Sequence, residues 1–317
     1  MKYGPEYAAE TYVAHAFEER VFDTGEVLLN HGVAGSAKNP ALLLIPGQSE
    51  SWWGFEKAMG LLQEHFQVFA VDLRGQGRSS RTPGRYTLDN MGNDLARFIA
   101  LGIRRPVIVS GLSSGGVLSA WLSAYALPGT IRGAHYEDPP LFSSEINPSC
   151  GQSIRQAVGP MFALWSKYLG DQWSVGDWQG MQAAAPRELP PWMAGMVGLL
   201  GSNPEPPQNL KEYDPEWARA FWTGTVAASC DHARMLARVK VPVLFTHHFR
   251  RVDEQTGNLM GAISDLQAQR VGELVRAAGQ SFDYQTFPAM GHSMHGQDPE
   301  LFTRTLVSWA ATLPDPV

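Results

Sequence analysis

The sequence is poor in cysteine and in long hydrophobic runs, and it carries no excess of positive charge. Its two cysteines, Cys150 and Cys230, form neither a disulfide framework nor a metal-ligand pattern, so we expect reduced thiols. No apolar run approaches the roughly 18 residues that a membrane span needs, and the first residues lead into no apolar stretch of a secretory signal. With a net charge of −6, neither nucleic acid nor an anionic membrane is an expected partner. We therefore expect a cytoplasmic protein, and the sequence leaves a homo-oligomer open.

The chain is rich in apolar residues, which make up 44% of its 317 positions, enough to bury a large core. Short apolar runs alternate with longer amphipathic ones, a pattern typical of an α/β domain with a mostly parallel sheet. Expected strands are 41–45, 68–71, 106–110, 241–245 and 282–287, after an antiparallel hairpin of 20–24 and 27–31. Expected helices are 53–65, 88–101, 117–126, 265–278 and 299–313.

One long stretch, residues 139–225, lacks strand signals and holds 6 of the 10 tryptophans and 11 of the 22 prolines. We predict that it is a helical cap inserted after the sixth strand, and that residues 1–138 and 226–317 form the core. An insertion at the carboxyl edge of a parallel sheet lies where ligands bind. Its bulky side chains would therefore line an apolar pocket, and Trp178, Trp192 and Trp222 are our candidates by residue type.

The pentapeptide Gly111-Leu112-Ser113-Ser114-Gly115 lies between a predicted strand and a predicted helix. In that context G-x-S-x-G indicates a nucleophile elbow, a turn so tight that both flanking positions must lack a side chain. The turn presents the Ser113 hydroxyl and places the N–H of Ser114 at a helix N-terminus, where it can stabilise an oxyanion.

A serine nucleophile needs a base, and among nine histidines His292 is best placed. It follows the last predicted strand and a glycine, in the loop before the final helix, where the chain order serine, acid, histidine requires the base. His295 is the rival, without a preceding glycine. The pair His247-His248 has no carboxylate at metal-ligand spacing, so we interpret it as structural.

Together with Ile45-Pro46-Gly47-Gln48 and the run Asp72 to Ser79, these motifs resemble the α/β-hydrolase family from about Arg20 to the end of the chain. The resemblance implies an α/β-hydrolase fold and a second oxyanion donor in the residue after Gly47, which is Gln48, with Ser49 as the alternative. Pro46 stands where the family usually has histidine, so a hydrogen bond that often braces this loop is missing.

For the catalytic acid the sequence offers three carboxylates. In most of the family it follows the strand that here ends near His247, and Asp253 is the nearest carboxylate there. In another branch it follows the preceding strand, where Glu137 and Asp138 stand. We favour Glu137, because a period-two strand would point Asp138 the opposite way. Asp253 and Asp138 remain alternatives.

These parts imply acyl transfer to Ser113, with no metal and no organic cofactor. A serine nucleophile disfavours haloalkane dehalogenase and epoxide hydrolase chemistry, since both need a carboxylate nucleophile. An acid after the sixth strand and a cap rich in tryptophan and methionine resemble the bacterial zearalenone lactonases, which open a macrocyclic ester. The expected substrate is thus a bulky apolar ester or lactone, and a role in mycotoxin detoxification follows from that resemblance alone.

Other functions of the same fold remain open: a carboxylesterase, a carbon–carbon hydrolase or a cofactor-free perhydrolase. The long insertion disfavours the small open pocket that a perhydrolase usually has. A hydrolase-like ligand receptor is a different class of protein, and the complete set of catalytic motifs disfavours it.

Overall fold

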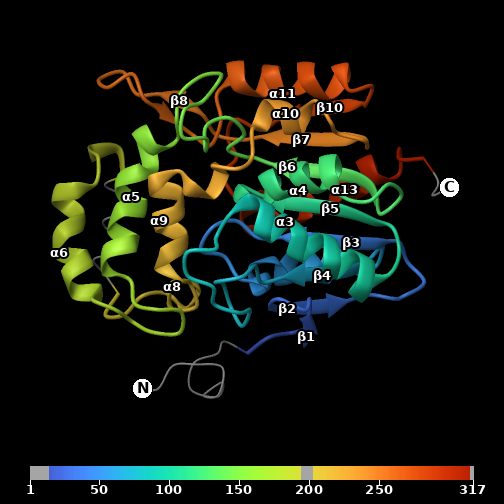
Figure 1. Cartoon of the computed structure of the whole chain (residues 1–317), viewed down its shortest axis with the longest axis horizontal. Coiled ribbons are helices and arrows are strands. Elements are labelled where there is room, and N and C mark those ends of the chain that lie inside the picture. Colours follow the sequence, from blue (N-terminus) through green and yellow to red (C-terminus); the bar gives the residue numbers. More distant parts are fainter. Residues whose placement is uncertain (1–13, 194–202, 315–317) are drawn as a thin grey trace.

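The computed structural model describes residues 14–193 and 203–314, which are built around one large sheet (Figure 1). Its eight strands lie in the order β1-β2-β4-β3-β5-β6-β7-β10. β2 pairs antiparallel with β1 and β4, and all neighbours from β4 to β10 are parallel. The strands are β1 (Glu18–Asp23), β2 (Leu28–Ala34), β3 (Ala41–Ile45), β4 (Gln67–Val71), β5 (Val107–Leu112), β6 (Ile131–Glu137), β7 (Val243–His247) and β10 (Phe282–Thr286). The predicted mostly parallel α/β architecture is confirmed.

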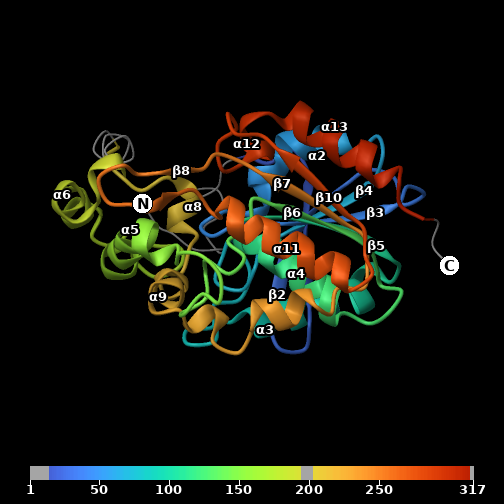
Figure 2. The same ribbon diagram turned by 90° about the horizontal axis from the view of Figure 1, so that it is seen from above.

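Helices cover both faces of this sheet, as Figure 2 shows. Side chains of α3, α4 and α11 join one apolar core, and those of α2 and α13 join a second core on the opposite face. The central strands β3 and β5 are buried along their whole length, which explains their continuous apolar sequences. The helical elements of this part are η2 (Trp52–Phe55), α2 (Glu56–Leu62), α3 (Leu88–Arg97), η3 (Phe98–Ile103), α4 (Ser114–Tyr125), α10 (His232–Leu236), α11 (Asp265–Ala277), α12 (Met294–Gln297) and α13 (Pro299–Ala310).

The expected hairpin and strands are present, with shifts that have local causes. The strand expected at 241–245 begins two residues later, because Pro242 has no N–H to donate to the sheet. The helix expected at 88–101 is divided into two elements: α3 forms its first part, and the π-helical turn η3 follows directly. No helix within the described ranges is both long and apolar enough to cross a membrane.

Between β6 and β7 the chain forms a group of helices to one side of the sheet, at the left of Figure 1. They are α5 (Arg155–Tyr168), α6 (Trp178–Glu188), η4 (Pro191–Met193), α8 (Gln208–Lys211), α9 (Pro215–Thr223) and η5 (Thr225–Ala227). α5 and α9 pack through Phe162 and Phe221, whose ring centroids are 5.5 Å apart. After β7 a short hairpin that sequence analysis did not anticipate, β8 (Arg251–Val252) and β9 (Leu259–Met260), extends toward these helices (Figure 2).

Buried polar contacts attach the segment containing α8 and α9 to the loops of the sheet. The Trp217 indole N–H donates to the carbonyl oxygen of Arg74 at 2.6 Å. The Ser51 hydroxyl donates to Glu212 at 2.6 Å, and the Tyr86 hydroxyl to Asp214. Breaking one of these bonds would leave a buried polar group without a partner, which costs free energy. The contacts therefore hold α8 and α9 firmly against the core.

Candidate active site

Ser113 lies at the sharp turn between β5 and α4, with φ 55° and ψ −120°. An L-residue adopts such angles only where its surroundings impose them. Both flanking glycines are required: a Cβ at Gly111 would lie 2.1 Å from the carbonyl oxygen of Gly115, and one at Gly115 would lie 2.2 Å from that of Ile45. Ser114 is the first residue of α4, so its N–H finds no acceptor within the helix. The local geometry is that of a nucleophile elbow.

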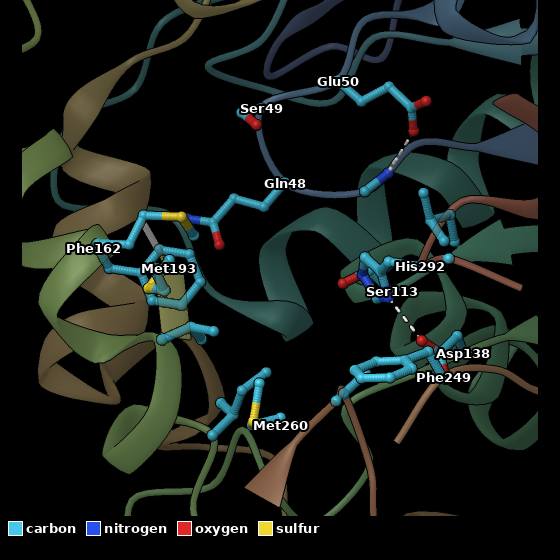
Figure 3. A pocket seen from close by; sticks show the side chains of 18 of the residues that line it. Gln48, Ser49, Glu50, Ser113, Asp138, Phe162, Met193, Phe249, Met260 and His292 are labelled. Atoms are coloured by element: carbon cyan, nitrogen blue, oxygen red, sulfur yellow. Dashed lines mark hydrogen bonds and ion pairs between the residues drawn. The ribbon is translucent and has the colours of Figure 1, made fainter. Parts of the chain in front are cut away.

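His292 lies in the loop between β10 and α12, and its ring is 48% exposed where it borders the same cavity as Ser113. Its Nδ1 is 2.7 Å from Oδ2 of Asp138, whose side chain is 2% exposed. The other carboxylate oxygen of Asp138 accepts the N–H of His248 at 3.2 Å. Figure 3 shows Ser113, His292 and Asp138 together at one wall of the cavity.

The carboxylate beside His292 is therefore Asp138, and the preference for Glu137 is corrected. The argument from strand alternation failed because β6 ends at Glu137. Asp138 has φ 41°, outside the extended region, so its side chain does not follow the alternation of the strand. The Glu137 carboxylate instead accepts the N–H of Met294 at 2.7 Å and lies 3.1 Å from His295 Nδ1.

Asp253 is also excluded as the partner of His292. It lies at the turn of the hairpin that β8 and β9 form, where its exposed carboxylate accepts the N–H and the hydroxyl of Thr256. Capping a turn is a common task of aspartate.

The hydrogen bond to Asp138 tunes the basicity of His292. Burial alone would lower the pKa of the imidazole, but the hydrogen bond and the negative charge of Asp138 outweigh it and raise the pKa above its ordinary value. A carboxylate on Nδ1 also leaves Nε2 as the proton acceptor, which is the tautomer that a general base for a serine requires.

The two predicted oxyanion donors belong to different elements, Gln48 to the loop after β3 and Ser114 to the start of α4. Gln48 belongs to the loop after β3 and lines the cavity with Ser113. A Cβ built on Gly47 would lie 3.4 Å from the Ser113 Cβ, so this loop closely approaches the elbow. The Gly47 N–H donates to the Glu50 carboxylate at 3.1 Å and is thus engaged within the loop. The Gln48 side chain points toward the segment between α8 and α9, where its amide donates to the Tyr213 hydroxyl at 2.5 Å.

The cavity has a volume of about 530 Å³ and is mostly apolar apart from the catalytic side. Figure 3 shows Phe162 and Met193 on one side of the cavity, Ser113 and His292 on the opposite side with Phe249 beside them, and Met260 at the bottom. The apolar lining residues are Leu112, Ile154, Val158, Met161, Phe162, Trp165, Met193, Phe249, Met260 and Ala262. Cavities of this size and character accept drug-sized apolar molecules.

Of the three tryptophans chosen by residue type, the two whose side chains are described do not line the cavity. Trp178 is buried among the helices between β6 and β7 and donates its indole N–H to the carbonyl oxygen of Asn203. Trp222 is 43% exposed, and its ring lies over Gly159 of α5. The side chain of Trp192 lies outside the described residues. Residue type alone could not separate these side chains from Trp165, because helix orientation decides which of them faces inward.

Phe249 and Met260 were missed by sequence analysis. They belong to the ends of the hairpin of β8 and β9, whose two-residue strands give almost no periodic signal. The adjacent residues His247 and His248, at the end of β7, have the contacts expected of a structural pair. His247 Nδ1 lies 2.8 Å from the Tyr284 hydroxyl, and His248 Nδ1 lies 3.0 Å from the carbonyl oxygen of Gly291.

Comparison with known proteins identifies a matching family and several relatives. The chain matches the Alpha/beta hydrolase family over residues 42–305. It is 32% identical over 146 residues to bifunctional epoxide hydrolase 2 of Sus scrofa, which is 44% of this chain but only 26% of that protein. It is 24% identical over 275 residues to the bifunctional esterase/perhydrolase DCH of Acinetobacter calcoaceticus, which is 83% of this chain and 88% of that protein.

Solved structures show the same fold. The enol-lactonase from Burkholderia xenovorans superimposes with a TM-score of 0.65 at 14% identity, over 92% of this chain and 100% of that one. The family match spans most of the sequence, and the chain accordingly belongs to the alpha/beta hydrolase family.

Proposed function

We propose that this hydrolase opens a bulky apolar lactone, of the size of the zearalenone macrocycle, through an acyl-enzyme on Ser113. The family and the esterase relative support hydrolysis of esters. The observation that carries the finer proposal is the cavity of about 530 Å³, where an apolar wall faces Ser113 and His292. In this proposal residues 139–225 act as the cap that supplies much of that wall.

The proposed reaction begins when the Ser113 hydroxyl attacks the lactone carbonyl and His292 takes its proton. Asp138 orients the imidazole and stabilises the imidazolium that forms. The carbonyl oxygen becomes an oxyanion, which the backbone N–H groups of Gln48 and Ser114 stabilise. His292 then returns the proton to the ring oxygen, and the carbon–oxygen bond of the lactone breaks.

Water completes the proposed cycle. His292 removes a proton from water as it attacks the acyl-enzyme, then protonates Ser113 as this group leaves. The product is a hydroxy acid that has gained one water. Because both halves of an opened lactone stay connected, the acyl-enzyme retains the entire molecule. A lactonase therefore needs a cavity for the whole substrate, and the lining that extends from Phe162 to Phe249 offers one.

An open-chain ester is the second candidate, and the relative named an esterase/perhydrolase favours it, since the match extends over 83% of this chain. Both candidates use the same triad. The two candidates differ in the size of the group that the cavity must hold, so comparing hydrolysis of a bulky lactone with hydrolysis of an open-chain ester separates them.

The test incubates wild-type protein and Ser113→Ala with zearalenone, and follows the lactone by chromatography and mass spectrometry. The proposal predicts a product one water heavier with the wild type only. Cleavage of p-nitrophenyl butyrate without any opening of zearalenone would favour the open-chain ester. Opening by Ser113→Ala at the wild-type rate would contradict the role of Ser113.

A further inference from the structure

A second histidine near the active site is enclosed by two carboxylates. His295, in α12, is fully buried, with its Nε2 2.8 Å from the Glu50 carboxylate and its Nδ1 3.1 Å from that of Glu137. Its ring stacks on Phe55 with centroids 3.9 Å apart and meets the edge of Phe302 at 5.6 Å. None of these contacts is used in the proposed reaction.

The arrangement favours a charged His295. Burial alone would lower its pKa, yet the negative charges of Glu50 and Glu137 raise the pKa to about 10. Burial alone would likewise raise the pKa of Glu137, but the His295 charge and hydrogen bond bring it to about 2. A buried imidazolium between two carboxylates is strongly held, because without it the two carboxylates would face each other with no compensating charge.

Glu50 and Glu137 together contact the three segments that carry the proposed chemistry. Glu50 accepts the N–H of Gly47, immediately before the proposed oxyanion donor Gln48, and Figure 3 draws this bond at the Glu50 carboxylate. The Glu137 carboxylate accepts the N–H of Met294, the first residue of α12, which directly follows the loop that bears His292. The Glu137 carbonyl oxygen accepts the N–H of Ser113 at 2.8 Å.

We propose that Glu50, His295 and Glu137 form a positioning bridge that fixes the oxyanion loop relative to Ser113 and His292. This inference rests on the proposed function, and it assigns Glu50 the task of bracing a loop in which Pro46 supplies no side-chain hydrogen bond. The bridge acts on the transition state, because the position of the Gln48 N–H matters most once the oxyanion has formed. Glu50 is a positioning residue in this account.

The experiment compares Glu50→Ala and Glu50→Gln with the wild type on p-nitrophenyl butyrate. For Glu50→Ala we expect kcat to fall roughly 100-fold, the loss typical of one displaced oxyanion donor, while KM changes little. Glu50→Gln should recover part of kcat, since its amide oxygen can still accept the Gly47 N–H. Asp72→Asn is the matched control: its buried carboxylate accepts the N–H of Trp52, the first residue of η2 just after this loop, without contacting Gly47 or His295. We expect it to lower thermal stability and leave kcat near the wild-type value.

A boronic acid supplies a readout that a merely structural role would not change. It forms a tetrahedral adduct with a catalytic serine and thereby needs the oxyanion donors. We expect its affinity to fall in Glu50→Ala by the same factor as kcat. Unchanged kcat and boronate affinity in folded Glu50→Ala and Glu50→Gln would overturn the bridge, as would a loss confined to KM.

Failure of the bridge and failure of the proposed function are separable. A fluorophosphonate probe labels an activated serine, so labelling of Ser113 in the wild type tests the function independently of Glu50. If Ser113 is labelled and Glu50→Ala keeps full kcat, only the bridge is wrong. If the wild type is not labelled at Ser113 and Ser113→Ala still hydrolyses the ester, the proposed function itself is wrong.

Discussion

At Asp138 a single backbone angle decides which carboxylate faces His292. A φ of 41° takes this residue out of the strand and lets its side chain reach His292, whereas Glu137 remains in the strand and faces His295. The sequence indicated a carboxylate directly after β6, but alternation along a strand could not anticipate the change of backbone angle at Asp138, just after the last strand residue. Ser113 and His292 were predictable because glycines with a specific steric task accompany the serine and chain order places the histidine.

Replacing each carboxylate by its amide tests the assignment of the acid. Asp138→Asn should reduce kcat by about 10⁴-fold, because the amide favours the wrong tautomer of His292. Glu137→Gln should cost far less, since it disturbs only the positioning bridge. Steady-state kinetics on p-nitrophenyl butyrate measures both variants. A larger loss in Glu137→Gln than in Asp138→Asn would restore the sequence-based preference for Glu137.

The pKa of His292 makes the activity pH-dependent. The imidazole must be neutral to take the serine proton, and Asp138 raises its pKa above 6.5, so kcat/KM should rise with pH through an inflection above that value. Asp138→Asn removes the negative charge that raises the pKa of His292, so the inflection of the remaining activity should move to lower pH. A profile of kcat/KM between pH 5 and pH 9, at constant ionic strength, checks the direction. An inflection that stays in place would show that Asp138 does not interact with His292.

Among the elements, the strands with continuous apolar sequence were the most predictable, because a strand that is buried on both faces consists almost entirely of apolar residues. The helices between β6 and β7 were predictable as a group, but which side chains they turn inward was not. Trp222 and Phe249 illustrate this: both are 43% exposed, yet only Phe249 lines the cavity. Trp222 was selected for its size, and Phe249 was overlooked because its hairpin is too short to show a pattern.

This pair of equally exposed aromatic residues supplies a matched test of the cavity wall. Phe249→Ala should raise KM for a bulky lactone or naphthyl ester about tenfold, corresponding to the apolar area lost from the wall. The effect on p-nitrophenyl acetate should be small, since a short acyl group does not reach the wall. Trp222→Ala should leave KM for both substrates unchanged. Equal effects of the two substitutions would contradict the assignment of the wall.

For the whole molecule, the charged bridge inside the core links folding stability to pH. The pKa of His295 rises from 6.5 to about 10 on folding, so its contribution is fully present below pH 6.5 and is lost as the pH rises through 10. The pKa of Glu137 falls from 4.5 to about 2, so its contribution is present above pH 4.5 and is lost as the pH falls through 2. Both contributions are therefore complete only between pH 4.5 and pH 6.5.

Thermal unfolding of the wild type and His295→Gln across pH 5 to pH 10 tests this linkage. The wild type should be the more stable protein near pH 6, and the difference in Tm should shrink steadily as the pH approaches 10. The variant lacks the titrating imidazole, so its own stability should vary less over this range. A constant difference in Tm from pH 6 to pH 10 would show that His295 is not held as a cation.

The central claim is that a lactone acylates Ser113. It is tested most directly by acid-quenching the first turnovers of zearalenone and measuring the mass of the protein and its peptides. The account predicts an adduct on the Ser113 peptide equal to the full mass of the lactone, because ring opening releases no leaving group, and no adduct in Ser113→Ala. An adduct on another residue, or turnover by Ser113→Ala, would contradict it.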